Sequence, residues 1–197
     1  MDMTLFFALL TFAFVASGTP GPNNLMLLAS GANFGFRRTL PHMLGISLGH
    51  SFMVFVIGLG LAQMFEALPV LRRILVVVSI AYMLWLAWKI AHAAAPKEGK
   101  AGGKPFTFLQ AAAFQWVNPK AWIMAIGAQT NYAQGEGWTS AAVVGIGFLM
   151  VNFPAITVWA WMGTEVRRLL TNSRRLTVFN WSMATLLVAS LLPILFH

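Results

Sequence analysis

Two proline-centred polar motifs hold the residues of this chain whose chemistry is most informative. They read TPGPNN at 19–24 and QWVNPK at 115–120, and each interrupts a long stretch with few charges. A membrane helix bonds its backbone N–H and C=O groups to each other, so a break exposes several kcal/mol of unsatisfied polarity unless something fills it. When corresponding positions in two halves of one chain carry such breaks, a substrate and its coupling ion are the expected occupants.

Lys120, in the second motif, carries the strongest electrostatic argument. Fifteen uncharged residues flank it on each side, and an ammonium near the bilayer centre costs at least ~2.5 to 3.5 kcal/mol, so it should face a cavity or a partner. A carboxylate is its natural counter-ion. The plainer interpretation is a lysine at a helix end that snorkels to lipid headgroups, but its place in the middle of the run favours the cavity.

In the first motif the backbone is opened and then held stiff. Two prolines fix φ, and Gly21 allows special conformations or close approach. The carbonyls of 16–18 then become available to a cation, while the next half-helix begins near Asn23 with free N–H groups suited to an anion. Asn23 or Asn24 could cap that start. The alternative is a kink that only fits neighbouring helices, which two consecutive asparagines at membrane depth make less favourable.

His50 is the one group in the middle of a predicted span that titrates near neutrality. Packing with a satisfied hydrogen bond is the commoner role of such a histidine, and proton coupling is the alternative. Because no Asp or Glu falls within an apolar run, a carboxylate proton relay is not expected. An ammonium ligand would be met by carbonyls, by asparagines or by aromatic faces such as Trp116 and Trp122.

The predicted substrate-binding residues therefore come from both motifs and from Asn152, which either lines the same cavity or belongs to a kink at Pro154. They are Pro20, Gly21, Pro22, Asn23, Asn24, Gln115, Asn118, Pro119, Lys120 and Asn152, with His50 as the candidate for proton coupling.

Composition places these motifs in a lipid bilayer. The chain is 58% hydrophobic and 9% charged, with a mean hydropathy of +0.73, which excludes an ordinary soluble domain. The formal charge of +8 comes from small basic groups between apolar runs, as topology determinants do, so nucleic acid is not an expected partner. We find no nucleotide-binding glycine loop, no zinc pattern and no nucleophile with a placed base. We therefore expect no enzyme, no catalytic residue, no metal and no cofactor.

The uncharged runs predict an all-α membrane protein with six transmembrane helices, of which the first and fourth are broken. A single transmembrane domain, 1–197, would contain two three-helix repeats, 1–92 and 107–197, joined by a cytoplasmic linker, 93–106. Since three spans per half insert the second half from the opposite side, the repeats must be inverted. The expected helices are roughly 4–33, 40–65, 70–92, 107–130, 138–164 and 177–196.

Basic residues predict the orientation. Of the thirteen Lys and Arg residues, ten follow the first, third and fifth spans, two occupy the opposite side and Lys120 remains in the membrane. Placing the richer side in the cytoplasm puts both termini outside. The apolar run 5–16 has no Lys or Arg ahead of it, so we expect a span there and not a secretory signal.

Taken together, these residues resemble the LysE/RhtB family of bacterial amino-acid exporters. The match covers nearly the whole chain in length and hydrophobic profile, and a narrower resemblance, carried by WLAWKI with Gln115 and Asn118, is to the branch that exports cysteine and O-acetylserine. The segments that carry the family resemblance are TPGPNN at 19–24, GFRR at 35–38, GISLG at 45–49, WLAWK at 85–89 and NPK at 118–120.

The resemblance implies secondary active export of small amino acids or their derivatives, of the threonine/homoserine or cysteine/O-acetylserine type, across the bacterial inner membrane. It also implies an ion gradient as the driving force, with a proton or sodium ion as the coupling ion and the oligomeric state left open. A passive channel and a non-transporting membrane subunit are the alternatives.

Overall fold

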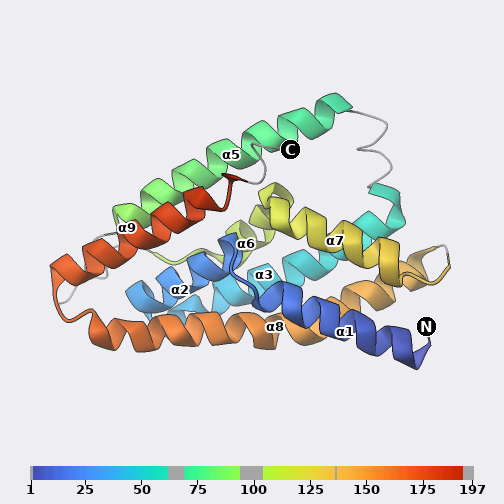
Figure 1. Cartoon of the computed structure of the whole chain (residues 1–197), viewed down its shortest axis with the longest axis horizontal. Coiled ribbons are helices and arrows are strands. Elements are labelled where there is room, and N and C mark those ends of the chain that lie inside the picture. Colours follow the sequence, from blue (N-terminus) through green and yellow to red (C-terminus); the bar gives the residue numbers. More distant parts are fainter. Residues whose placement is uncertain (1, 62–68, 94–103, 136, 193–197) are drawn as a thin grey trace.

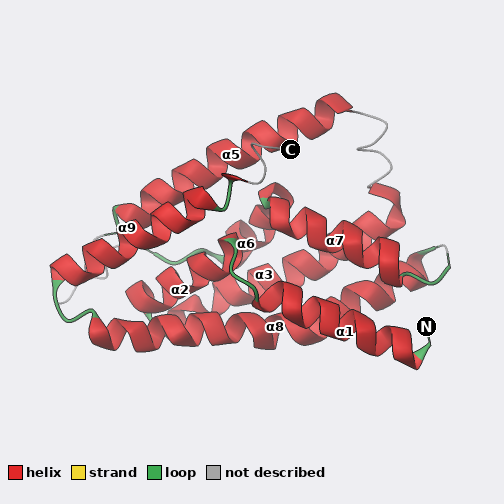
Figure 2. Ribbon diagram, viewed as in Figure 1, coloured by secondary structure: helices red, strands yellow, loops and turns green. Residues whose placement is uncertain are grey.

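The computed structural model describes residues 2–61, 69–93, 104–135 and 137–192, and regular structure in these ranges is entirely helical (Figure 2). The elements in chain order are α1 (Met3–Gly18), α2 (Pro22–Phe34), α3 (Phe36–Val56), the π-helix η1 (Ile57–Leu61), α5 (Pro69–Ala91), α6 (Phe108–Phe114), the 3-10 turn η2 (Gln115–Val117), α7 (Pro119–Tyr132), α8 (Trp138–Leu169) and α9 (Ser173–Ala189).

Both interruptions lie where the prolines predicted them. The axes of α1 and α2 meet at 56° across a break of three residues. In the second motif the helix ends at η2, Asn118 is extended, and Pro119 occupies the first turn of α7. A proline is tolerated there because its missing N–H would have had no intrahelical partner. In each case, therefore, a proline is the first residue of the helix that follows the break.

The long helix α8 organises the packing. It lies against α1, α2 and α3, while α3 also packs on α6, and α5 pairs with α9 to one side (Figure 1). Backbones approach closely at glycines: a Cβ on Gly31 would overlap the carbonyl of Ala160, and one on Gly163 would overlap the carbonyl of Leu28. Small residues permit such contacts between membrane helices.

Three helical segments are long and apolar enough to cross a membrane by themselves, or four if the bent pair α1–α2 is one span, among the residues described. They are Phe36–Leu61, Arg73–Ala91 and Trp138–Leu169. The other predicted spans correspond to shorter pieces, since α6 and α7 have 7 and 14 residues and α9 has 17. The chain is thus an all-helical protein with membrane-spanning segments, and the count of six stays a prediction.

Some predicted boundaries are wrong by a few residues. α3 begins at Phe36, directly after Gly35 with its φ of 81°, and not at residue 40. α8 continues to Leu169 instead of ending at 164. In this last turn Arg168 pairs with Glu165 at 2.7 Å, and basic side chains complement the negative end of the helix dipole. The predicted end of the second span, most of the linker 93–106 and the last residues of the sixth span lie outside the described residues.

Most of the described basic residues lie at one end of the molecule, which we call the basic end. The α2–α3 and α8–α9 junctions lie there, whereas the N-terminus and the α7–α8 junction lie at the opposite end (Figure 1). Gly35 and Arg167 illustrate this proximity, because a Cβ on Gly35 would lie 3.3 Å from Nη1 of Arg167. The described members of this group are Arg37, Arg38, Lys89, Lys104, Arg167, Arg168, Arg174 and Arg175.

The close contact of α2 with α8 predicts a stability effect. Gly163→Ala should destabilise the protein by about 1 to 3 kcal/mol because its Cβ overlaps backbone that cannot rotate away. Gly127→Ala is the matched control, since its Cβ would lie 3.7 Å from the Phe12 ring, an ordinary contact. The midpoint of thermal unfolding in detergent should fall for the first variant and not for the second. Equal midpoints would contradict the packing described here.

Candidate functional site

The two broken segments meet at the side chain of Lys120. Its Nζ donates to the Thr19 carbonyl at 2.8 Å, to the Thr19 hydroxyl at 2.7 Å and to the Pro20 carbonyl at 3.2 Å. An ammonium has three donors, so all three are used in this conformation. Lys120 therefore faces a partner, as the sequence predicted, but that partner is the backbone of the other motif.

Gly21 makes room for this contact. A Cβ at that position would lie 2.7 Å from Cδ of Lys120 and 3.1 Å from its Nζ. The φ of Gly21 is 178°, which any residue can adopt, so close approach and not conformational freedom explains the glycine. Of the two roles considered for Gly21 from the sequence, close approach is the one seen.

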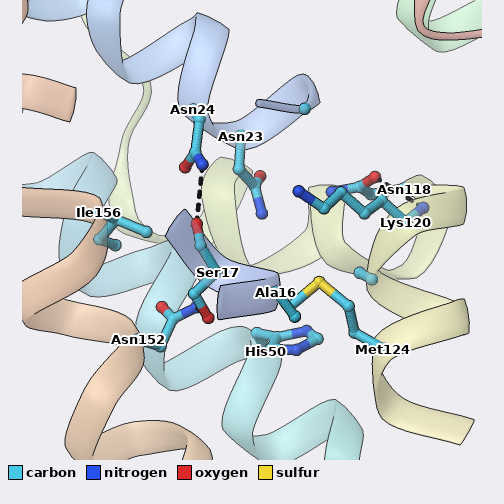
Figure 3. A pocket seen from close by; sticks show the side chains of 12 residues that line it. Ala16, Ser17, Asn23, Asn24, His50, Asn118, Lys120, Met124, Asn152 and Ile156 are labelled. Atoms are coloured by element: carbon cyan, nitrogen blue, oxygen red, sulfur yellow. Dashed lines mark hydrogen bonds between the residues drawn. The ribbon is translucent and has the colours of Figure 1, made fainter. Parts of the chain in front are cut away.

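Asn24 reaches back across the break to the end of α1. Its Nδ2 donates to the carbonyls of Ser17 and Thr19, both at 2.7 Å (Figure 3 shows the first of these bonds). The predicted capping of α2 by Asn23 or Asn24 is wrong, because the residue at the cap is Gly21 and no side chain bonds there. With the carboxamide turned toward α1, it stabilises carbonyls that the broken helix leaves open.

The carbonyls at the end of α1 are thus occupied in this conformation. Besides the bonds from Asn24 and Lys120, the Gly18 carbonyl accepts from Nε1 of Trp159 at 3.0 Å. The expectation that these carbonyls are open to a ligand cation is therefore not met in this conformation. A ligand would have to displace a donor that is already present.

A reciprocal amide pair joins α2 to the end of α6. Asn23 donates to Gln115 at 2.8 Å, and Gln115 donates back at 3.1 Å and also to the Ala111 carbonyl at 2.9 Å. Gln115 is completely buried. In the same segment the side chain of Asn118 accepts from the Lys120 backbone N–H at 3.2 Å and so caps α7.

A small cavity of about 20 Å³ lies between the breaks, with lining residues from α1, α2, α3, α7 and α8 (Figure 3). We call it the central cavity. This volume suits about one water molecule and not an amino acid. Seven of the predicted residues line it: Gly21, Asn23, Asn24, His50, Asn118, Lys120 and Asn152. Pro20, Pro22, Gln115 and Pro119 are not lining residues; the three prolines flank the breaks, and Gln115 holds Asn23.

Four buried polar atoms of the cavity lining have no hydrogen-bond partner among the described residues. They are Oδ1 of Asn24, Oδ1 of Asn152 and both ring nitrogens of His50. Asn152 is held by a bond from its Nδ2 to the Ser17 hydroxyl at 3.0 Å. Since buried polar atoms are almost always paired, this group marks a place for a polar occupant.

His50 does not fit the satisfied-packing interpretation, because neither ring nitrogen is bonded. The ring is 2% exposed and stands edge-on to Phe148, with 5.1 Å between centroids. The aromatic faces expected to meet an ammonium lie elsewhere: Trp122 donates to the Trp116 carbonyl at 2.9 Å, and neither residue lines the cavity.

Sequence reasoning missed several residues of the site. Ser17 and Thr19 bond to Asn152 and Lys120, and Met124 and Ile156 supply apolar wall. Ser17 stands out in the sequence only as a polar residue two positions before the first motif. No spacing rule connects it to Asn152, because the contact depends on how α1 packs against α8.

An all-helical membrane protein whose two broken segments enclose a polar cavity has the features of a small-solute transporter. Residues 14–192 match the family described as LysE type translocator. The cysteine/O-acetylserine efflux proteins of Escherichia coli (strain K12) and Shigella sonnei (strain Ss046) are each 31% identical over 191 residues, covering 95% of this chain and 96% of the relative. No solved structure matches the chain.

The chain therefore belongs to the LysE family of translocators, as the sequence motifs predicted. This is a family of membrane transporters and not of enzymes.

The bonds made by Asn24 predict a stability effect. Asn24→Ala leaves the Ser17 carbonyl without a donor and should cost about 1 to 3 kcal/mol. Asn131→Ala is the control, since that side chain makes one exposed bond to the Gly127 carbonyl. Thermal unfolding should show a clear fall for Asn24→Ala and almost none for Asn131→Ala, and an equal fall would contradict the role given to Asn24.

Proposed function

We propose that the protein is a secondary active exporter of small amino acids or their derivatives, of the cysteine/O-acetylserine type, in the bacterial inner membrane. The observation that carries the proposal is the bonding of the Lys120 ammonium, which belongs to the lining of the central cavity, to the Thr19 and Pro20 carbonyls at the neighbouring break. One motif thus offers a cation and the other offers carbonyl oxygens, which are the two groups that a zwitterion needs. The names of the relatives support this substrate class.

Substrate binding proceeds by exchange of ammonium groups. The substrate ammonium takes the carbonyl oxygens of Thr19 and Pro20, and the Lys120 ammonium turns to the substrate carboxylate. The first N–H groups of α2 lie at the same break and add positive potential for that carboxylate. Because the substrate is a zwitterion, the net charge of the site is the same before and after binding. No step leaves an unpaired cation in the membrane.

The conformation described here is closed. A cavity of about 20 Å³ cannot hold an amino acid, so binding requires the halves of the protein to separate. A further cavity of about 90 Å³ borders His42, and another of about 400 Å³ borders 57–60. At 1.5 Å per residue, His42 lies roughly 12 Å from His50 along α3, and Ile57, just past the other end of α3, lies roughly 10 Å from it. Together the three cavities trace a route along this helix.

Each side of the central cavity has a distinct barrier. The Asn23–Gln115 pair separates it from the cavity near His42, where Met26 is part of the lining. Apolar packing that includes Met53 and Phe148 separates it from the cavity at the opposite end. Alternating access opens one barrier at a time. A passive channel would need both open together.

Two inverted repeats, 1–92 and 107–197, carry the motion. Part of the packing supports this division: α1 lies against α8 as α6 lies against α3, and α2 and α7 each contact the long helix of the other half, although α2 packs on α8 more extensively than α7 packs on α3. The helices α3 and α8 contact each other, as do α5 and α9. With the basic end in the cytoplasm, both termini face the periplasm.

The coupling ion, a proton or sodium, acts at the polar group formed by His50, Asn24 and Asn152. These residues supply the unbonded oxygen and nitrogen atoms of the central cavity. No Asp or Glu belongs to the described lining; of its two titratable residues, His50 and Lys120, His50 is the type that ordinarily exchanges a proton near neutral pH.

Removal of Lys120 tests the proposal directly. Cells loaded with radiolabelled cysteine should release it at least tenfold more slowly with Lys120→Ala than with the wild-type protein, because the substrate carboxylate loses its partner. Arg174→Ala is the control, since its exposed side chain lies at the basic end and outside the cavity. Efflux equal to wild type from Lys120→Ala would remove Lys120 from the mechanism. Export against the cysteine gradient that persists after collapse of the ion gradients would contradict coupling.

Gly21 gives a second, gentler test. Gly21→Ala should fold, because the flexible Lys120 side chain can move, but its ammonium should leave the Thr19 and Pro20 carbonyls and transport should fall about tenfold. Gly18→Ala is a matched control three residues away, where a Cβ meets nothing within 4 Å. Both variants should accumulate in the membrane as the wild type does. Equal transport by both would show that the placement of Lys120 does not matter.

A further inference from the structure

A second cavity lies at the basic end, between α2, α3, α5 and the stretch 104–106. Its volume of about 90 Å³ is more than four times that of the central cavity. Met26, Leu86 and Ile90 form part of an apolar wall. This cavity shares none of its lining residues with the central one.

Two lysines, Lys89 and Lys104, line this second cavity, and no Asp or Glu is among its described lining residues. The Nζ of Lys89 lies 4.6 Å from the centroid of the Trp85 ring and 6.0 Å from that of Phe106. Aromatic faces attract an ammonium and position it without neutralising its charge. The cavity thus presents positive charge with no anion of the described chain to balance it.

His42 is a buried polar group of the same cavity with no partner. Its side chain is 2% exposed, and both ring nitrogens lack a hydrogen bond among the described residues. Its ring lies 5.2 Å from that of Phe106, which also flanks Lys89. Because a buried imidazole without a hydrogen bond is costly, it indicates an occupant that can bond to it.

The other polar residues of the lining, Ser30 and Asn33, already have hydrogen-bond partners outside it. Asn33 donates to Asn180 at 2.9 Å, and the hydroxyls of Ser30 and Thr39 lie 2.9 Å apart. These bonds fix the wall and leave the lysines and His42 as the groups available to a ligand. A small molecule with one anionic group and a short side chain fits this combination.

We propose that this second cavity is a cytoplasmic binding site that holds the carboxylate of a small amino acid between Lys89 and Lys104, with His42 bonded to the same molecule, before the substrate reaches the central cavity. The proposal rests on the proposed function, since it assumes an amino-acid substrate and the basic end in the cytoplasm. His42 precedes His50 by eight residues on α3, so the transfer covers about 12 Å. An anionic lipid headgroup would bring the same charge and is the rival occupant.

Everted membrane vesicles, whose cytoplasmic face is outward, test this site. Initial uptake of radiolabelled cysteine is measured against concentration for the wild type and for the double variant Lys89→Gln/Lys104→Gln. We expect the half-saturation concentration to rise about tenfold, with a maximal rate within twofold of wild type. The conservative variant Lys89→Arg/Lys104→Arg should remain within threefold of wild type because it keeps both charges.

The control is Arg37→Gln/Arg174→Gln, which removes two exposed charges from the same end but none from the cavity. It should leave the half-saturation concentration unchanged. In right-side-out vesicles, where substrate is supplied from the periplasmic face, the lysine variant should match the wild type.

Three results would distinguish a failure of the proposed function from a failure of this second site. If wild-type vesicles take up no cysteine while the protein is present and folded, the proposed function fails and this site with it. If the wild type transports cysteine and Lys89→Gln/Lys104→Gln has the same half-saturation concentration as Arg37→Gln/Arg174→Gln, the second site is overturned and the proposed function stands. If purified protein shows a difference between wild type and variant only in liposomes that contain phosphatidylglycerol, and not in phosphatidylcholine alone, the cavity holds a lipid headgroup.

Discussion

The rest of this structure depends on one ammonium group held among backbone carbonyls inside a membrane protein. Lys120 is expensive to bury unless its three donors are satisfied, and they are satisfied only because α1 ends early and exposes the carbonyls of Thr19 and Pro20. The break in α1 needs a cation at its end, where the helix dipole is negative. Lys120 and the first break therefore stabilise each other.

The hydrogen bonds around this contact hold the helices close together in the conformation described here, and the atoms left unpaired show where a ligand could bind. Asn24 and Trp159 bond to the remaining carbonyls at the end of α1, and the Asn23–Gln115 pair ties α2 to α6. Within the central cavity, the unpaired atoms of the described lining belong to His50 and to one oxygen each of Asn24 and Asn152. They lie in the same cavity as the Lys120 ammonium, and a polar ligand would relieve their unsatisfied polarity.

Much of this could be predicted from residue types and local spacing. Prolines located both breaks to within a residue or two because they cannot donate a backbone hydrogen bond, and the uncharged flanks of Lys120 indicated a cavity. Composition identified a membrane protein, and the motifs identified its family. These inferences depend on properties that a residue carries with it wherever the chain folds.

Partners across the molecule were not predictable in the same way. The contacts of Lys120 with Thr19, and of Asn152 with Ser17, join residues more than a hundred positions apart and depend on the packing of α1 against α7 and α8. The asparagines of the first motif had been expected to cap α2, but Asn24 bonds to carbonyls on the other side of the break and Asn23 to the Gln115 side chain. The break in the fourth predicted span followed from its proline, but the 3-10 turn η2 and the lengths of α6 and α7 on either side of it did not.

The central claim is that the substrate ammonium and Lys120 compete for the same carbonyls while Lys120 then binds the substrate carboxylate. Ligand-induced shifts in the thermal midpoint of purified protein test it, with cysteine compared with cysteamine, which lacks the carboxylate; the chain has no cysteine to react with either thiol. Relative to wild type, Lys120→Met should bind cysteamine more tightly, because the carbonyls are no longer occupied, and cysteine more weakly, because its carboxylate has lost its partner. Parallel changes for the two ligands, in either direction, would contradict the exchange.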